Sequence, residues 1–228
     1  MQDYLKTKSL FSFEHTLAAK LLSECEYPWQ AIPKIKEFIL KLGKTLNPDI
    51  YTEVKEGVWI AKSAKIAPTS YIGAPTVIGE ESEIRHSAFI RGSVIIGKRC
   101  VVGNSTEMKN SIIFDDVQVP HYNYVGDSVL GWRSHLGAGS VTSNVKSDKT
   151  QVSIKIGNEK IETGLKKFGA ILADTVEVGC NSVLCPGTVI GKNSTIYPLT
   201  RVRGFLPENS IFKGEGQIIT KTERQDLI

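Results

Sequence analysis

An apolar residue that returns at every sixth position is the feature that most constrains this chain. The series begins at Ile60 and runs unbroken through Ile60, Ile66, Ile72, Ile78, Ile84, Ile90, Ile96, Val102 and Met108. The residues that follow each member are small or polar, as in Ile78-Gly79-Glu80. A helix has a period of about 3.6 residues and a strand a period of two, so neither alone gives this spacing. The pattern predicts one short strand and one turn in every six residues, with the apolar side chain pointing inward.

Three such repeats close a triangular coil of about 18 residues, and successive coils stack as parallel strands about 4.8 Å apart. Stacking builds a continuous core that no single repeat could bury. The series then slips through two steps of five residues, at Ile113 and Leu130. After an interruption its phase returns in Leu172, Val178, Leu184, Ile190, Ile196 and Val202. We therefore predict a mainly β chain in which residues 58–213 form a parallel β-helix.

Residues 147–165 break the repeat. Apolar and polar residues alternate there, with Val152, Ile154 and Ile156 as the apolar members, and Gly157-Asn158 follows as a turn. This pattern predicts a β-hairpin that projects from one corner of the β-helix. Such an arm would either close over a site or clasp a neighbouring subunit.

The first 57 residues differ in pattern from the repeat. Apolar side chains recur there at helical spacing, and a second helix is expected to start at Pro33 and stop at Gly43. We expect residues 1–57 to form a small helical cap over the open end of the β-helix, where strand edges are otherwise unpaired. The polar residues 214–228 are expected to form a short helix or a tail.

Composition narrows the function classes. The chain has 228 residues, 41% of them hydrophobic, which is enough for a sizeable core and excludes a disordered, collagenous or small disulfide-bonded chain. No apolar run reaches the roughly 18–20 residues of a membrane span, and the N-terminus lacks a signal-peptide pattern, so we expect a cytoplasmic protein. The four cysteines form no CxxC pair, which predicts free thiols. A net charge of +4 without a basic tract predicts neither nucleic acid nor membrane as a partner, but suits a small anionic ligand.

A motif inside the repeat identifies a family. The segment Pro120-His121-Tyr122-Asn123-Tyr124-Val125-Gly126-Asp127 resembles the acetyltransferase half of the bifunctional enzyme that makes UDP-N-acetylglucosamine, in which a His-x-x-Tyr-x-Gly-Asp segment carries the catalytic base. Arg91, residues 103–109 and residues 136–144 extend the match, which covers most of residues 58–213. The resemblance implies a left-handed β-helix of hexapeptide repeats. The hairpin and Lys167-Phe168 are closer to the archaeal-type sugar-1-phosphate nucleotidyltransferase/acetyltransferases, for which both glucosamine-1-phosphate and galactosamine-1-phosphate are plausible acceptors.

The resemblance assigns roles to individual residues. His121 matches the catalytic base, and Glu107 matches a residue that orients or polarises it. Positions that bind the amino-sugar phosphate are matched by Arg91, Lys109, Tyr124, His135 and Lys167. Positions that contact acetyl-CoA, the implied co-substrate, are matched by Ala138, Asn144, Val145, Cys180 and Pro198. In this family the sites lie between neighbouring β-helices of a homotrimer, and Lys167 matches a residue contributed across the subunit boundary.

The residue types suit acyl transfer. An amine attacks a thioester only as the free base, and an imidazole with an ordinary pKa of about 6.5 can accept its proton near neutral pH. The guanidinium of Arg91 and the ammonium of Lys109 together suit a phosphate. The backbone N–H groups of Gly137-Ala138-Gly139 are candidates to stabilise the oxyanion.

Several positions depart from the bifunctional enzyme. His135 replaces an asparagine, Val145 an aromatic residue and Cys180 a serine, and Glu215 falls near an arginine that meets the coenzyme phosphates. These departures leave open a non-catalytic trimeric protein that binds a sugar nucleotide or CoA. The residues before the repeat are too few for the nucleotidyltransferase half, so we expect that step to need a separate sugar nucleotidyltransferase.

A metal enzyme on the same fold, the γ-type carbonic anhydrase, is a further alternative. It needs three histidines that meet at one zinc ion. The spacing of His86, His121 and His135 lacks the pair five residues apart that this family uses. The sequence therefore predicts no metal site.

Overall fold

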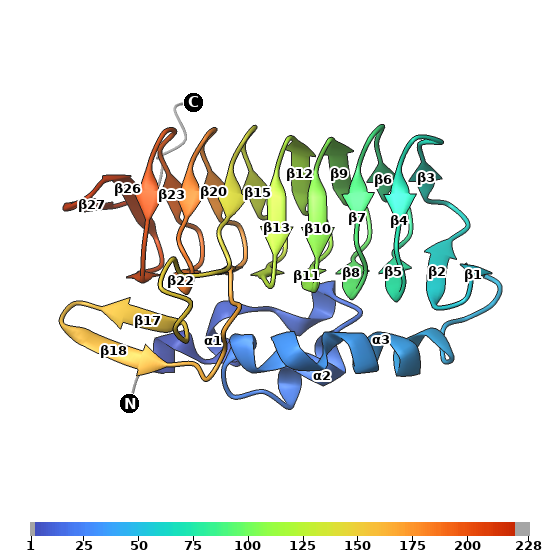
Figure 1. Cartoon of the computed structure of the whole chain (residues 1–228), viewed down its shortest axis with the longest axis horizontal. Coiled ribbons are helices and arrows are strands. Elements are labelled where there is room, and N and C mark those ends of the chain that lie inside the picture. Colours follow the sequence, from blue (N-terminus) through green and yellow to red (C-terminus); the bar gives the residue numbers. More distant parts are fainter. Residues whose placement is uncertain (1–2, 222–228) are drawn as a thin grey trace, which may run out of the picture.

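A computed structural model describes residues 3–221 of the chain. Its body is a stack of coils whose strands form three sheets, one along each face of the stack (Figure 1). We call the faces sheets A, B and C. Sheet A runs in the order β1 (Tyr51–Lys55), β2 (Val58–Ala61), β5 (Thr76–Ile78), β8 (Val94–Ile96), β11 (Ser111–Ile113), β14 (Val129–Leu130), β19 (Ala170–Leu172), β22 (Thr188–Ile190) and β25 (Phe205–Leu206). Sheet B contains β3 (Lys65–Ile66), β6 (Glu83–Ile84), β9 (Val101–Asn104), β12 (Gln118–His121), β15 (His135–Leu136), β20 (Glu177–Val178), β23 (Thr195–Ile196), β26 (Ser210–Gly214) and β27 (Gln217–Thr220).

Sheet C completes each coil. It contains β4 (Tyr71–Ile72), β7 (Phe89–Ile90), β10 (Glu107–Lys109), β13 (Tyr124–Gly126), β16 (Val141–Thr142), β21 (Val183–Leu184) and β24 (Arg201–Val202). Each coil contributes one strand to A, then one to B and one to C, and strands of successive coils pair in parallel. Within these three sheets, only the outermost pairs described, β1 with β2 and β26 with β27, are antiparallel. The predicted parallel β-helix is therefore confirmed, while its left-handed sense stays a prediction.

The steps of five residues shorten a coil without breaking its register. Ile78 pairs with Ile96, one coil of 18 residues further on, and Ile96 pairs with Ile113 after only 17. All three side chains are fully buried in the core. Because each turn absorbs the missing residue, the inward apolar ladder remains continuous along the stack.

Sheet A is buried on both of its faces from β5 to β22. The outward side chains of its strands are also apolar and fully buried: Val77, Ile95, Ile112, Val129, Ile171 and Val189. The N-terminal helices cover this face (Figure 1): η1 (Asp3–Leu5), α1 (Thr7–Leu10), η2 (Phe13–His15), α2 (Ala19–Ser23), η3 (Pro28–Lys34) and α3 (Ile35–Gly43). Helix α3 contacts β5 and β8, and η3 contacts β14.

The prediction that these helices cap the open end of the β-helix is wrong. They run along the side of the stack, from Tyr4, which stacks on Phe205 of the last sheet A strand at 4.6 Å, to Gly43, which packs against Trp59 of β2. The physical reason is the outward apolar ladder of sheet A, which needs a cover along its whole length. Pro33 lies within the 3-10 helix η3 rather than at the start of α3.

The hairpin is confirmed. Strands β17 (Ser153–Ile156) and β18 (Glu159–Glu162) pair antiparallel across the Gly157-Asn158 turn. The hairpin is not free along its whole length, because β17 contacts β25 and Ile154 is fully buried. In the C-terminal segment, β27 pairs antiparallel with β26 instead of forming a helix, and residues 222–228 lie outside the described part.

Candidate functional site

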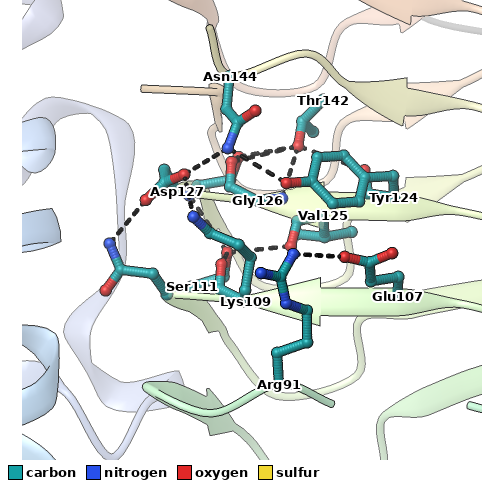
Figure 2. Close-up of polar contacts among 12 residues, drawn as sticks. Arg91, Glu107, Lys109, Ser111, Tyr124, Val125, Gly126, Asp127, Thr142 and Asn144 are labelled. Carbon is teal, nitrogen blue, oxygen red and sulfur yellow. Dashed lines mark hydrogen bonds and ion pairs between the residues drawn. The ribbon is translucent and has the colours of Figure 1, made fainter. Parts of the chain in front are cut away.

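Five of the predicted site residues come together on the outer face of sheet C (Figure 2). Glu107 and Lys109 belong to β10, and Tyr124 to β13. Arg91 directly follows β7, and Asn144 lies two residues beyond β16. Parallel pairing places Glu107 beside Tyr124 in register, so residues far apart in sequence meet on adjacent strands.

The two predicted phosphate ligands each have a carboxylate partner. Arg91 Nη1 lies 2.8 Å from Glu107 Oε1 in a partly exposed pair, and this hydrogen bond raises the pKa of Arg91. Lys109 Nζ lies 3.0 Å from Asp127 Oδ2, and the side chain of Asp127 is only 4% exposed. An anion that binds here must therefore share these cations with carboxylates.

Asn144, which matches a coenzyme contact, is connected by hydrogen bonds to residues that match acceptor ligands. Its Nδ2 group donates to Asp127 Oδ2 and, at 3.2 Å, to the hydroxyl oxygen of Tyr124. Burial is the main cause that raises the pKa of Tyr124, followed by the negative charges of Asp127 and Glu107. Tyr124 consequently keeps its proton at neutral pH and can donate it in a hydrogen bond.

A second group of predicted residues forms a row along the corner between sheets B and C. The carbonyl of His121, at the end of β12, accepts from Gly139 N at 3.0 Å. The carbonyl of Ala138 accepts from Asn181 N at 2.8 Å, and that of Cys180 from Leu199 N at 2.9 Å. His121, Ala138, Cys180 and Pro198 thus lie on successive coils at one corner, and the side chain of His121 is exposed. The predicted base is in line with three predicted coenzyme contacts.

Buried Asn123 shapes the turn that presents His121. Its Oδ1 accepts from His121 N at 3.1 Å, while its Nδ2 donates to the carbonyls of Gly137 and Ser140 in the next coil. Tyr122 between them adopts a positive φ of 52°. No role for Asn123 was predicted from the sequence, in which the available signal is a turn-forming asparagine directly after His121-Tyr122.

The expected contact between Glu107 and His121 is not formed. Within residues 3–221 no hydrogen bond or ion pair joins them, because the Glu107 carboxylate turns to Arg91. The expected oxyanion donors are also mostly engaged: Gly137 N donates to Val178 O at 2.7 Å, and Gly139 N to His121 O. Of the three, the Ala138 N–H is the one without a hydrogen bond in the described chain.

The remaining predicted residues are more dispersed. His135 lies on β15 in sheet B, where its Nδ1 is 2.9 Å from Glu177 Oε2, and it does not join the sheet C cluster. Val145 and Lys167 are both exposed. Val145 follows Asn144, and Lys167 precedes Phe168, whose N donates to Asn144 O at 3.0 Å. They therefore flank Asn144.

The described residues give no support for a metal site, a disulfide or a membrane-spanning helix. No group of three or more His, Cys, Asp or Glu side chains is placed to hold a metal ion in the described residues. All four cysteines are free: Cys25 and Cys100 are buried, while Cys180 is exposed. No helix between residues 3 and 221 has the length and apolar character to cross a membrane.

The coils define a parallel β-helix built from six-residue repeats, and comparisons with known proteins show what this chain is similar to. The GMPPB C-terminal domain family matches residues 77–163. The Methanococcus maripaludis bifunctional protein GlmU is 32% identical over 198 residues, 86% of this chain and 48% of that protein. A bifunctional sugar-1-phosphate nucleotidylyltransferase/acetyltransferase from Sulfurisphaera tokodaii is 36% identical over 94 residues, 41% of this chain and 22% of that protein.

The predicted resemblance to these bifunctional proteins is thereby confirmed. The chain spans about half the length of the Methanococcus maripaludis protein, and less of the Sulfurisphaera tokodaii protein. Among solved structures, the Bacillus cereus N-acyltransferase AntD, in complex with dTDP and coenzyme A, is 18% identical with a TM-score of 0.40. That match covers 77% of this chain and 92% of the other.

Proposed function

We propose that this chain is an acetyl-CoA-dependent N-acetyltransferase whose acceptor is an amino-sugar phosphate, glucosamine-1-phosphate or galactosamine-1-phosphate. The row of His121, Ala138, Cys180 and Pro198 along one corner is the observation that carries the proposal. It aligns an exposed imidazole with the positions that match coenzyme contacts. The names of the similar bifunctional proteins support the same chemistry.

In the proposed reaction the free amine attacks the carbonyl carbon of the acetyl thioester. The His121 imidazole accepts the proton that leaves the nitrogen, and the Ala138 N–H stabilises the oxyanion. When the intermediate collapses, the C–S bond breaks and the CoA thiolate takes that proton from the imidazolium. The products are an N-acetyl sugar phosphate and free CoA, and His121 returns to its starting state.

Arg91 and Lys109 are the proposed ligands of the sugar phosphate. Both cations already have carboxylate partners, so the net charge of Arg91, Glu107, Lys109 and Asp127 is zero. A phosphate dianion would gain from a further cation. We propose that the active form is a homotrimer and that Lys167 of a neighbouring chain adds this charge.

The test follows CoA release from acetyl-CoA with glucosamine-1-phosphate and galactosamine-1-phosphate as acceptors. We expect acceptor-dependent release, reduced about 100-fold or more in His121→Ala, the scale of a lost general base. His86→Ala is the matched control, because His86 is an exposed histidine on the same corner, one coil before Asn104 and Ser105. Equal losses in the two variants would refute the role of His121.

The pairing of Glu107 with Arg91, which leaves His121 without its expected carboxylate partner among the described residues, favours a second candidate, a protein that binds acetyl-CoA or a sugar nucleotide without turnover. In that case calorimetry would detect coenzyme binding while no amino-sugar phosphate releases CoA. A separate sugar nucleotidyltransferase remains the proposed partner for any nucleotidyl transfer to the product.

A further inference from the structure

One buried carboxylate in the sheet C cluster has no assigned role. Asp127 follows β13 directly and adopts a positive φ of 50°. Its Oδ2 accepts from Lys109 Nζ at 3.0 Å and from Asn144 Nδ2, and its Oδ1 accepts from Asn110 Nδ2 at 2.8 Å. Figure 2 shows Lys109, from β10, and Asn144, from the segment after β16, converging on this side chain.

We propose that Asp127 is a positioning residue that fixes the Lys109 ammonium and the orientation of the Asn144 amide, and through Asn144 the hydroxyl of Tyr124. This inference rests on the proposed function, because it describes how the acceptor and coenzyme sides of that site are coupled. Asp127 itself is not expected to touch either substrate, since its side chain is 4% exposed and its oxygens are occupied.

The donor and acceptor chemistry makes this assignment specific. An ionised carboxylate only accepts hydrogen bonds, so it can face the NH₂ group of Asn144 but not its carbonyl oxygen. The second hydrogen of that NH₂ group goes to the Tyr124 oxygen. Asn144 Oδ1 is therefore turned away from Asp127 as an acceptor, and the Tyr124 proton remains for donation.

The backbone around Asp127 is held as firmly as the side chain. Asp127 N donates to Lys109 O at 3.1 Å, and Gly169 N donates to Asp127 O at 2.9 Å. The carboxylate consequently joins the coil before it, through Lys109 and Asn110, to the coil after it, through Asn144. A change at Asp127 should reach the proposed phosphate ligand and the proposed coenzyme contact together.

Asp127→Asn is the informative variant, because asparagine has nearly the same size and tolerates positive φ. The new amide must turn its NH₂ group either toward Asn110, at the Oδ1 position, or toward Lys109 and Asn144, at the Oδ2 position, and in both orientations the negative charge that faces Lys109 is lost. We expect kcat/KM to fall about 10- to 100-fold, with a raised KM for the acceptor, as for a lost hydrogen bond to a charged group. Combined with Lys109→Met, the losses should be less than multiplicative, because both changes break the same contact.

Asp116→Asn is the matched control. Asp116 also lies in a coil turn with positive φ, 61°, and pairs with Arg99 at 2.7 Å and with Trp132 Nε1 at 3.0 Å. A purely structural role predicts similar thermal destabilisation in both variants and no kinetic difference between them. We expect only Asp127→Asn to change kcat/KM.

A second readout does not depend on turnover. The hydrogen bond from Asn144 lowers the pKa of Tyr124, so Asn144→Ala should raise that pKa in wild type and raise it less in Asp127→Asn, where Asp127 no longer fixes the Asn144 amide. The ionisation of Tyr124 is measured by ultraviolet absorbance as the difference from Tyr124→Phe, in both aspartate backgrounds. If wild type releases no CoA, the proposed function fails and this titration alone decides the inference. An equal effect of Asn144→Ala on the Tyr124 pKa in both aspartate backgrounds would overturn it, whatever the kinetics.

Discussion

The cover over sheet A can be tested with a single buried residue. Ile95 lies on β8, points outward from the core, and is fully buried where α3 contacts that strand. Ile95→Ala removes three carbon groups, worth about 2.4 kcal/mol of transfer free energy at about 0.8 kcal/mol each. The cavity that remains raises the expected loss of unfolding free energy to about 3–4 kcal/mol. For a domain of this size that corresponds to a melting temperature lower by about 6–16 °C.

Ile218→Ala is the control, because Ile218 lies on β27 and is 49% exposed. Its expected cost is at most about 0.5–1 kcal/mol, typical of a surface substitution. Both variants are compared with wild type by thermal unfolding followed by circular dichroism. If Ile95→Ala and Ile218→Ala cost the same, the helices do not cover sheet A in solution and our account of the fold is wrong.

Further predictions concern two side chains with unusual surroundings. Burial raises the pKa of Tyr51 to about 12, and its hydroxyl has no hydrogen-bond partner within the described residues. Tyr51→Phe should therefore leave stability at pH 7 equal or higher by about 1 kcal/mol. Because the folded pKa lies above the unfolded value near 10, wild type should lose stability as the pH rises from 10 to 12, and denaturant unfolding should show no such loss in Tyr51→Phe. Alkylation of exposed Cys180 should weaken acetyl-CoA binding by calorimetry, with protection by the coenzyme; equal weakening in alkylated Cys180→Ser would exclude this thiol.

The sequence was sufficient to predict the coils because each repeat is a local unit that repeats the same packing. The position of the N-terminal helices was not predicted, although a signal for it exists. At every third repeat the residue before the inward apolar side chain is also apolar, as at Val77, Ile95 and Ile112. A strand with apolar residues on both faces is covered on both faces, so this second ladder indicates a covered sheet.

The candidate site, too, could be predicted from the sequence only in part. The corner row that contains His121 and Ala138 follows from counting residues per coil, since turns stack on turns. The pairing of Glu107 with Arg91, rather than with His121, depends on side-chain directions that spacing does not determine. The loss of Gly137 and Gly139 as oxyanion donors likewise follows from backbone bonds between coils.

The contact between Tyr4 and Phe205 has a consequence for how the molecule assembles. A stack of coils with only neighbouring contacts can form and fray one coil at a time, with stability that is nearly a sum over its repeats. Here the earliest residues of the chain dock on its last sheet A strand, with ring centroids 4.6 Å apart. Such distant contacts are slow to form, and the helical segment cannot complete its docking until the final coils exist. The segment therefore ties both ends of the stack into one cooperative unit, in which the loss of the last coil loosens the first helix.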